Sequence, residues 1–562
     1  MDHLSGLDAT FLYMETAETP MHVGSLNLYQ LPAGYQGEFV DDLRAHIAMR
    51  MHLVPVFQRK LVNMPFELAN PIWVTDDDVD LEYHIRSTVL PKPGNREQLD
   101  RLVGRLHSSL LDRSRPLWEF YVIEGVQSPP DAPPGTRYVA FYSKLHHAAI
   151  DGGAGVALTM AITDTSPVPR AVRPAPLRRH TPADHFGIAE LAGSGLRNTA
   201  VQAIKLIRTL PALARAALRM LRPTKGPAAE HLPGTAEKLT WFAPKTPLNV
   251  SITNQRIFSS FSLPLDELKQ ISKGNGATLN DVVLAICSGA LRQYLADLNC
   301  VPEHSLLAGV PVSLREEGNT QMNTQASMMR INLASIVTDP LQRLAAIRHY
   351  TQEAKALTAS VKSVLPTDFP SLGAPWLISG IAGLFGRSKL ANTLPPVTNL
   401  AISNVPGPRM PLYLAGAKML TYYPVSIVVH GVALNVTVQS YNGAVDFGLI
   451  ACRKAMPDLP ELAKYMQAAH RELLELTHAA QTPQDAPSVA PAGEPTKAAT
   501  AATERPATHV RPKVLAKAVK PAPRKPPPRA SASKPKRGSR TALKLVASKP
   551  AAIPLKRARK AA

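Results

Sequence analysis

The chain has 562 residues, of which 45% are hydrophobic and 19% charged, and its formal net charge is +20. This length exceeds one ordinary hydrophobic core, so we expect two or three domains. Most of the charge lies near the C-terminus: residues 481–562 carry 19 Lys and Arg against 3 Asp and Glu, whereas the rest of the chain carries 44 against 40. Because the chain before residue 481 is nearly neutral, we do not expect it to contain a basic nucleic-acid-binding domain. Binding of nucleic acid would depend on the tail, residues 481–562.

The cysteines and the N-terminal sequence indicate the cellular compartment in which the protein works. Cys287, Cys300 and Cys452 show no CxxC or metal-ligand spacing and cannot all pair with one another, so we expect a reducing environment and no metal site. The N-terminus has early acidic residues and no uninterrupted apolar run after a basic start, which is not the pattern of a signal peptide. No stretch reaches the about 18 apolar residues that span a bilayer. We therefore expect a cytoplasmic protein.

Residues 1–178 are predicted to form a first domain that mixes helices and strands. Apolar residues recur at helical spacing over residues 96–112. Residues 118–126 and 136–147 are rich in aromatic and β-branched residues and flank a loop of turn formers, QSPPDAPPG. This pattern predicts a β-hairpin whose second strand delivers two histidines to its end.

Residues 179–239 are predicted to be a linker, because the composition shifts there to Pro, Arg and Ala. Within it, residues 196–223 project as an amphipathic helix, kinked at Pro211. One face of this helix carries the cations Arg197, Lys205, Arg208, Arg215, Arg219 and Arg222. The pattern is typical either of a linker helix packed on the body or of an interfacial membrane helix, and both interpretations stay open.

Residues 240–478 are predicted to form a second mixed domain. Residues 276–298 have the pattern of a capped helix, with Thr278 or Asn280 as N-cap. The apolar stretch 372–386 fits either a buried core helix or a surface that dips into lipid.

The end of the second domain predicts two strands and a helix. Residues 426–453 have the pattern of two strands joined by an Asn-Gly turn, and residues 456–480 that of a terminal amphipathic helix. Residues 479–562 repeat Ala, Pro and Lys with almost no aromatic residue. We expect this tail to be disordered, because it cannot bury enough apolar surface to fold.

The stretch SKLHHAAIDGG, residues 143–153, is the main candidate site. Neighbouring residues at a strand end point to opposite faces, so one of His146 and His147 is a candidate base and the other is structural. Histidine suits general-base work near neutral pH. Asp151 could fold back to fix the loop or pair with an arginine. No serine or cysteine nucleophile motif accompanies them, which favours direct transfer over a covalent acyl-enzyme.

HHAAIDG resembles the HHxxxDG signature of the coenzyme A-dependent acyltransferase superfamily, shared with peptide-synthetase condensation domains and chloramphenicol acetyltransferase. Further stretches resemble one branch of it, the bacterial wax ester synthase/acyl-CoA:diacylglycerol acyltransferases. In chain order these are LSGLDATFLYMET, TPMHVGSL, RPLWEFYVIEGV, APKTPLNVSI, LNDVVLAICSGALRQYL, GVPVSLR and TNLAISNVPGP. The resemblance covers both predicted domains and leaves out the tail.

The resemblance implies an α/β fold of the α+β sandwich type, in which two chloramphenicol-acetyltransferase-like domains form a substrate tunnel. It implies acyl transfer from acyl-CoA to diacylglycerol or a long-chain alcohol, giving triacylglycerol or wax esters, with acyl-CoA as a substrate and no cofactor. His147 would then be the general base, Asp151 would hold the loop by an ion pair, and His146 would support the site. Because the substrates are lipids, we expect peripheral association with the inner membrane or with lipid inclusions.

The same resemblance makes eight further residues candidates for substrate binding. They are Gly152, Pro116, Leu117, Trp118, Asn280, Asp281, Ser403 and Asn404. Plainer interpretations stand beside these. A Trp in a strand is typical of a core residue, and Asn280 with Asp281 is typical of a helix cap and its neighbour. Ser403 and Asn404 are candidate oxyanion donors or members of a proline-braced loop.

Two other functions stay open from the sequence. A peptide-synthetase-like condensation domain would use the same signature on carrier-protein thioesters. A binder of nucleic acid or of an anionic surface would work through the tail, where KPAPRKPPPRASASKPKRGSR resembles the tails of linker-histone-like proteins and would bind phosphates by charge. We expect such binding to be an accessory property.

Overall fold

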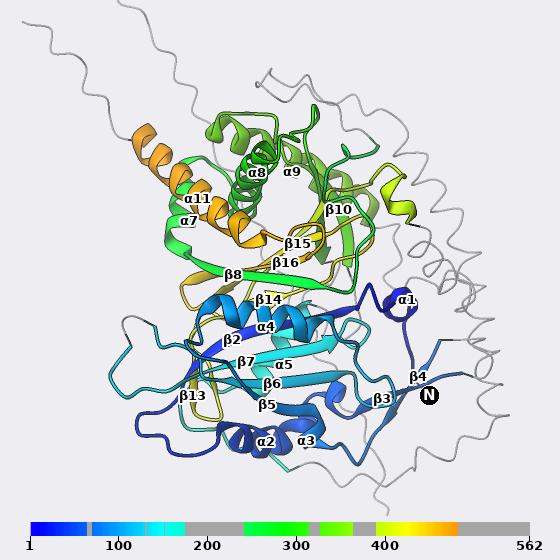
Figure 1. Cartoon of the computed structure of the whole chain (residues 1–562), viewed down its shortest axis with the longest axis vertical. Helices are drawn as coiled ribbons and strands as arrows, with labels where there is room; N and C mark the ends of the chain where they lie inside the picture. The colour runs from blue at the N-terminus through cyan, green and yellow to red at the C-terminus, as the bar shows by residue number, and fades with distance from the viewer. Residues whose placement is uncertain are drawn as a thin grey trace, which may run out of the picture. The chain divides into compact units, whose positions relative to one another are not determined.

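Two large β-sheets carry the core, and helices pack against them (Figure 1). The computed structural model describes residues 2–64, 70–129, 132–150, 152–174, 241–313, 326–362 and 389–481. All described residues belong to one unit, Met1–Asp485, and none to the second unit, Ala486–Ala562. The mixed α/β class expected from the sequence is confirmed within the described part of the chain.

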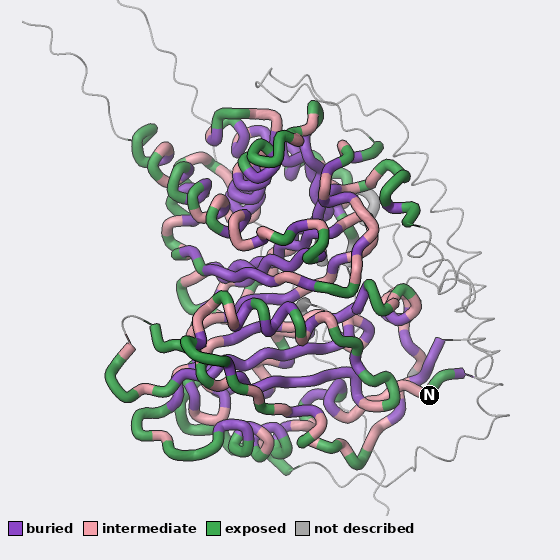
Figure 2. Tube along the Cα trace, in the orientation of Figure 1, coloured by how far each residue is buried: buried purple, intermediate pink, exposed green. Residues whose placement is uncertain are grey.

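The first large sheet has seven strands and holds the histidine motif. Its order is β12-β13-β2-β7-β6-β5, and β14 also pairs with β2. The strands are β2 (His22–Gln30), β5 (Ile85–Val89), β6 (Trp118–Glu124), β7 (Tyr138–His146), β12 (Tyr413–Leu414), β13 (Ala417–Met419) and β14 (Tyr423–Val425). Every residue of β7 is buried, because this strand lies between β2 and β6 in the middle of the sheet. Figure 2 shows these central strands as an almost continuous buried band.

Helices and a small sheet surround this first sheet. The helices are α1 (Gly6–Met14), α2 (Phe39–Arg50), α3 (Leu81–His84), α4 (Arg96–Ser108) and α5 (Gly152–Ile162), with short turns η1 (Met51–Leu53) and η2 (Pro55–Phe57). The small sheet, in the order β1-β4-β3, contains β1 (Asp2–His3), β3 (Arg59–Val62) and β4 (Ile72–Thr75). Helix α1 lies between β1 and β2 in the chain, so the segment after α1 leads directly into β2.

The second large sheet has six strands in the order β10-β9-β11-β15-β16-β8. The strands are β8 (Arg256–Pro264), β9 (Leu307–Ser313), β10 (Ala326–Asn332), β11 (Leu400–Val405), β15 (Leu434–Tyr441) and β16 (Ala444–Cys452). Its helices are α7 (Leu265–Gly274), α8 (Leu279–Asp297), α9 (Pro340–Lys362) and α11 (Leu459–Gln481), with the short turn η5 (Leu390–Asn392). Buried aliphatic side chains of α8, α11 and the strands form one apolar core.

The two sheets are joined by strands of the C-terminal half that extend the first sheet, and by a shared core. Strands β12, β13 and β14 come from the C-terminal half of the chain, yet they extend the N-terminal sheet beside β2 (Figure 1). Helix α4 packs between the sheets, where Val103 shares a buried cluster with Tyr142 of β7 and Phe258 of β8. Gly24 permits the close pairing of β2 with β7, because a Cβ there would lie 1.8 Å from the carbonyl oxygen of Ser143.

Several elements expected from the sequence are confirmed. Helix α4 begins at Arg96, β6 and β7 form the antiparallel hairpin, and β15 and β16 flank the Asn442-Gly443 turn. Of the two candidate caps of α8, the structure selects Thr278, whose side chain accepts from the Asp281 amide.

Other expected features lie outside the described residues. They are the whole linker 179–239 with its helix at 196–223, the apolar stretch 372–386, and the tail beyond residue 481. The domain boundaries and the tunnel between the domains therefore stay predictions.

Candidate active site

The hairpin strand β7 ends at His146, and its two neighbouring segments hold the histidine pair in place. The His146 amide donates to Leu117 O (3.0 Å), just before β6, and the His147 amide donates to Met21 O (2.8 Å), just before β2. His146 is fully buried, whereas His147 is half-buried. The two adjacent histidines therefore occupy different environments, as the alternation of a strand predicts.

His146 is engaged through both ring nitrogens. The Ala148 amide donates to Nδ1 (3.0 Å), so in the neutral ring the proton lies on Nε2. That nitrogen lies 3.3 Å from Glu15 Oε1. His22, the cross-strand partner of His146 in the β2–β7 register, has its own Nε2 3.2 Å from the same oxygen. Among the described residues, neither Nε2 of His146 nor Nε2 of His22 makes a well-aligned hydrogen bond. Their contacts with Glu15 are therefore bent polar contacts with a carboxylate.

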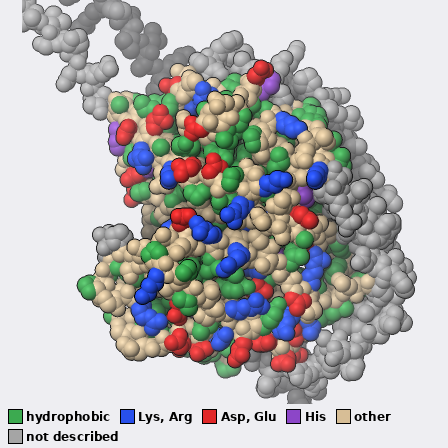
Figure 3. Space-filling model, in the orientation of Figure 1, with side chains coloured by type: hydrophobic (Ala, Val, Ile, Leu, Met, Phe, Trp, Pro, Cys, Tyr) green, Lys and Arg blue, Asp and Glu red, His purple; other side chains and the backbone are tan. Residues whose placement is uncertain are grey.

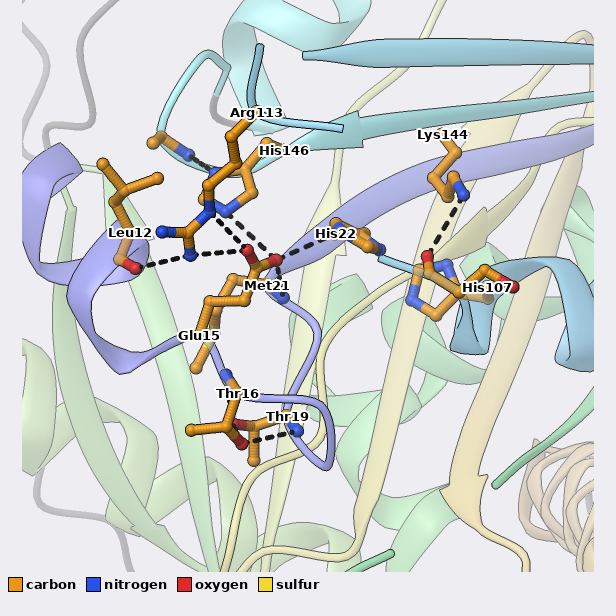
Figure 4. A network of polar contacts seen from close by, with 12 residues as sticks. Leu12, Glu15, Thr16, Thr19, Met21, His22, His107, Arg113, Lys144 and His146 are labelled. Carbon is orange, nitrogen blue, oxygen red and sulfur yellow. Dashed lines mark hydrogen bonds and ion pairs between the residues drawn. The ribbon is translucent and has the colours of Figure 1, made fainter. Parts of the chain in front are cut away.

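Glu15 lies at the centre of this network (Figure 4). Its side chain is 2% exposed, and its Oε2 accepts from Arg113 Nε (3.0 Å) and Nη2 (2.6 Å). Burial acts to raise the pKa of the Glu15 carboxyl, but the contacts with His146 and His22 outweigh burial and hold that pKa well below its usual range. Burial lowers the pKa of His22 to about 4, despite the attraction of Glu15. At neutral pH the network therefore contains a carboxylate, a guanidinium and a neutral His22.

The ring of His147 rests on an aromatic side chain. Phe11 of α1 stacks against it, with ring centroids 3.9 Å apart and planes 15° apart. A flat stack leaves the edge of the imidazole as the part that can meet a reacting group, and of its two nitrogens Nδ1 is buried. His147 thus has a fixed backbone, a supported ring face and partial exposure, which are the properties that a general base needs.

A second buried polar layer lies behind His22. His107 of α4 contacts Tyr142 Oη through Nδ1 (2.8 Å) and Ser426 O through Nε2 (2.9 Å), and its ring centroid is 6.0 Å from that of His22. Lys144, fully buried on β7, lies 2.8 Å from a Glu119 carboxylate oxygen on β6. Burial lowers the pKa of Lys144 against the attraction of Glu119.

Sequence reasoning missed Glu15, His22 and Arg113. Glu15 and His22 lie in the stretches LSGLDATFLYMET and TPMHVGSL, which supported the family resemblance without any role for single residues. Their meaning depends on the pairing of β2 with β7 and on the path of the chain after α1. No spacing in the sequence carries that information.

The predicted residues around the motif differ in their placement. Asp151 lies outside the described residues, and Gly152 is the first residue of α5. Pro116 and Leu117 are buried just before β6, where Leu117 O holds the His146 amide. Trp118 is fully buried; its indole donates to Phe57 O (3.2 Å) and its ring stacks on His84. This is the environment of a core residue, and a substrate-binding role for Trp118 stays a prediction.

The remaining predicted residues belong to the second sheet and its helices. Asp281 is buried in the capping box of α8, and its Oδ1 also accepts from Thr351 Oγ1 (2.7 Å). Asn280 is half-buried in the first turn of the same helix. Ser403 and Asn404 are half-buried in β11, which pairs in parallel with β15. The structure thus gives Asp281 a structural task, while the substrate roles of all four residues stay predictions.

A separate cleft of about 1160 Å³ opens between α4, β8 and the start of α11. None of the predicted site residues lines it, so it does not extend the candidate site. Figure 3 shows cationic and acidic side chains interspersed on the displayed face rather than gathered by sign. Among the described residues, no group of three or more His, Cys, Asp or Glu side chains could hold a metal ion. None of the described helices is both long and apolar enough to cross a membrane.

Comparison with known proteins places this chain. A Mycobacterium tuberculosis protein whose name assigns it diacylglycerol O-acyltransferase activity is 38% identical over 473 residues, which cover 84% of this chain and 99% of that protein. The chain belongs to the wax ester synthase/diacylglycerol acyltransferase family. Residues 4–283 match the catalytic-domain model of this family, and residues 323–474 match its C-terminal-domain model.

Two further members of the family agree. The O-acyltransferase WSD of Acinetobacter baylyi is 34% identical over 475 residues, covering 83% of this chain and 96% of WSD. The solved wax ester synthase/diacylglycerol acyltransferase of Marinobacter aquaeolei is 30% identical and superposes with a TM-score of 0.58, covering 85% of this chain and all of that one. The resemblance stated from the motifs is confirmed, and family membership favours it over the condensation-domain alternative.

Proposed function

We propose that this chain transfers a fatty acyl group from acyl-CoA to the hydroxyl of diacylglycerol or of a long-chain alcohol, with no cofactor. The names of the relatives support the reaction class, since they are called diacylglycerol O-acyltransferase and wax ester synthase. The observation that carries the mechanism is the division within the histidine pair. His146 is buried, with Nδ1 accepting a hydrogen bond and Nε2 3.3 Å from the Glu15 carboxylate, while His147 is half-buried on the Phe11 ring.

In the proposed reaction His147 acts as general base. It takes the proton from the acceptor hydroxyl while the hydroxyl oxygen attacks the thioester carbonyl carbon, forming a tetrahedral oxyanion. Collapse of this intermediate breaks the carbon–sulfur bond, and the proton on His147 passes to the departing thiolate of coenzyme A. The products are the ester and free coenzyme A, so atoms and charges balance without any external co-reactant.

The other predicted residues take supporting roles in this proposal. His146 joins the strand end to Glu15, Asp151 is proposed to hold the loop by an ion pair, and Gly152 is proposed to contribute to substrate binding. Pro116, Leu117 and Trp118 are proposed to line the substrate pocket beside the end of β7. Asn280 and Asp281 of the second half of the fold are proposed to contribute to substrate binding. Ser403 and Asn404 are the proposed donors to the oxyanion, a contribution worth about 3 kcal/mol per donor in other acyl-transfer enzymes.

The direct test uses the purified full chain. Palmitoyl-CoA is offered with hexadecanol or with dipalmitoylglycerol, and both ester formation and thiol release are followed. We expect ester and thiol in equal amounts with at least one acceptor, and neither product with a His147→Ala variant that keeps the wild-type thermal midpoint. Absence of ester with both acceptors would remove the proposed function. Near-wild-type turnover in the folded variant would remove only the general-base assignment.

We also propose that the enzyme works in the cytoplasm at a lipid surface, such as the inner membrane or a lipid inclusion. Five large apolar residues with exposed fractions between 39% and 63% support this, and they come from two segments joined by a bond from the Ala243 amide to Pro396 O (2.8 Å). They are Trp241, Phe242, Leu390, Leu394 and Val397. Aromatic side chains of this kind favour a membrane interface.

Vesicle flotation tests this surface. A Trp241→Ser/Phe242→Ser variant is compared with Met49→Ser, which alters an equally exposed apolar residue on α2. We expect weaker flotation with phosphatidylglycerol-containing vesicles for the double variant alone. Equal flotation of all three proteins would contradict this assignment of the surface.

A further inference from the structure

We propose that Glu15 is a positioning residue for His147, which it holds in place through Met21 and through helix α1. The inference rests on the proposed function, because it assigns to His147 the role of base. The Glu15 side chain is 2% exposed and lies against side chains of the protein, so it acts through its neighbours rather than on substrate.

The first link runs through one peptide unit on each side of Met21. Glu15 Oε1 accepts from the Met21 amide (3.3 Å), and the Met21 carbonyl oxygen accepts from the His147 amide (2.8 Å). The loop between Glu15 and Met21 is closed by backbone bonds between Thr16 and Thr19, 3.1 and 3.4 Å long. The carboxylate therefore fixes a short closed loop whose far end holds the backbone of the candidate base.

The second link runs through α1. Glu15 is the first residue after this helix, and Arg113 Nη2 donates both to Glu15 Oε2 (2.6 Å) and to Leu12 O (2.9 Å). Arg113 thus joins the carboxylate to the last turn of α1. Phe11, the neighbour of Leu12, supports the ring of His147. Backbone and ring of His147 are consequently held by two paths that both begin at Glu15.

The charge of Glu15 is needed for this arrangement. Glu15 Oε1 accepts from the Met21 amide and lies close to Nε2 of both His146 and His22. Glu15 Oε2 accepts from two nitrogens of Arg113. A carboxylate accepts on both oxygens, whereas a glutamine amide would turn an NH₂ group toward one of these donor sets. Glu15→Gln is therefore nearly isosteric yet incompatible with its surroundings.

The test compares Glu15→Gln, Glu15→Asp and Arg113→Gln with Glu18→Gln, an exposed acid in the same loop. Palmitoyl-CoA and hexadecanol are the substrates. For Glu15→Gln we expect kcat to fall about 100-fold, the cost of a displaced catalytic group, with KM for both substrates within about twofold. Glu15→Asp should recover part of kcat because it keeps the charge. Arg113→Gln should lower kcat alone, and Glu18→Gln should leave it unchanged.

The pH profile of kcat/KM separates positioning from general structural damage. The charged and titratable groups facing Glu15 are His22 on β2, His146 on β7 and Arg113, with His107 of α4 and Lys144 beyond His22. Glu15 contacts His146, the chain neighbour of the proposed base His147. Loss of the negative charge of Glu15 should disfavour the protonated form of the His147 imidazole. The acid limb should therefore move to lower pH in Glu15→Gln and stay in place in Glu15→Asp.

Wild-type kcat and an unshifted acid limb in folded Glu15→Gln would overturn the proposal. If that variant does not fold, an unchanged kcat in Arg113→Gln and Glu15→Asp together would overturn it. Failure of the proposed function looks different, because the wild-type chain would then form no ester at all.

Discussion

Phe11 lies flat against His147, with the ring centroids 3.9 Å apart and the planes 15° apart. This stack comes from the first helix of the chain and the end of a strand more than a hundred residues later. It places an electron-rich ring face under the imidazole that the proposed reaction protonates. Such a face favours a cation over a neutral ring.

Phe11→Leu should therefore lower kcat by about fivefold, since an aromatic pair is worth about 1 kcal/mol beyond its apolar area. Phe11→Tyr keeps the ring and should keep kcat. The acid limb of kcat/KM should move to lower pH in the leucine variant only. Steady-state kinetics from pH 5 to pH 9 check this, and equal profiles for both variants would show that the ring face does not matter.

Replacement by alanine should affect activity at His147 and stability at His146. His147→Ala should lose at least about 100-fold in kcat, the range of general-base contributions, with an almost unchanged thermal midpoint. His146→Ala leaves the Ala148 amide without its acceptor and Glu15 without one buried neighbour, so unfolding should be easier by about 1–3 kcal/mol. Urea unfolding and single-turnover assays of both variants distinguish these outcomes. Equal loss of stability in the two variants would contradict the division of roles.

His22 should make the fold sensitive to mild acid. Its pKa is about 4 in the folded protein and near 6.5 when unfolded, so the unfolded chain binds more protons between these values. The stability that depends on neutral His22 is complete above about pH 6.5 and is lost as the pH falls toward 4.

The thermal midpoint of the wild type should therefore fall more steeply over that interval than that of His22→Asn. His304→Asn, which removes an exposed histidine, serves as control and should follow the wild type. Parallel curves for the wild type and His22→Asn would disprove the contribution of His22.

The basic tail should be separable from the enzyme. Helix α11 runs to Gln481, and its residue Thr477 accepts a hydrogen bond from Asn275, so a truncation should follow Gln481 and leave the helix whole. We expect esterification to be unchanged and salt-sensitive binding to DNA or anionic vesicles to weaken. Loss of acyl transfer in the folded truncated protein would contradict this separation.

Much of the local structure could be predicted because it depends on neighbours in the chain. The hairpin of β6 and β7, the helix α4, the Asn442-Gly443 turn and the capped helix α8 follow from periodicity, turn residues and caps within a few positions. The same local information separated the neutral body from the basic tail. The order of short motifs was enough for the family, which the comparisons confirm.

The contribution of strands β12 to β14 to the N-terminal sheet could not be predicted, because it depends on pairing between residues about four hundred positions apart. The same holds for Asp281, where the alternatives of substrate contact and helix cap differ only in what packs against α8.

The sequence by itself determined that two histidines stand at the end of a strand in an acyltransferase family and that only one of them can face a substrate. The tertiary structure decided which partners each histidine has. Pairing of β2 with β7 sets His22 opposite His146, and the turn after α1 buries Glu15 against both. The physical reason is that a buried carboxylate needs several donors at once, and only the folded chain brings donors from distant segments to one point.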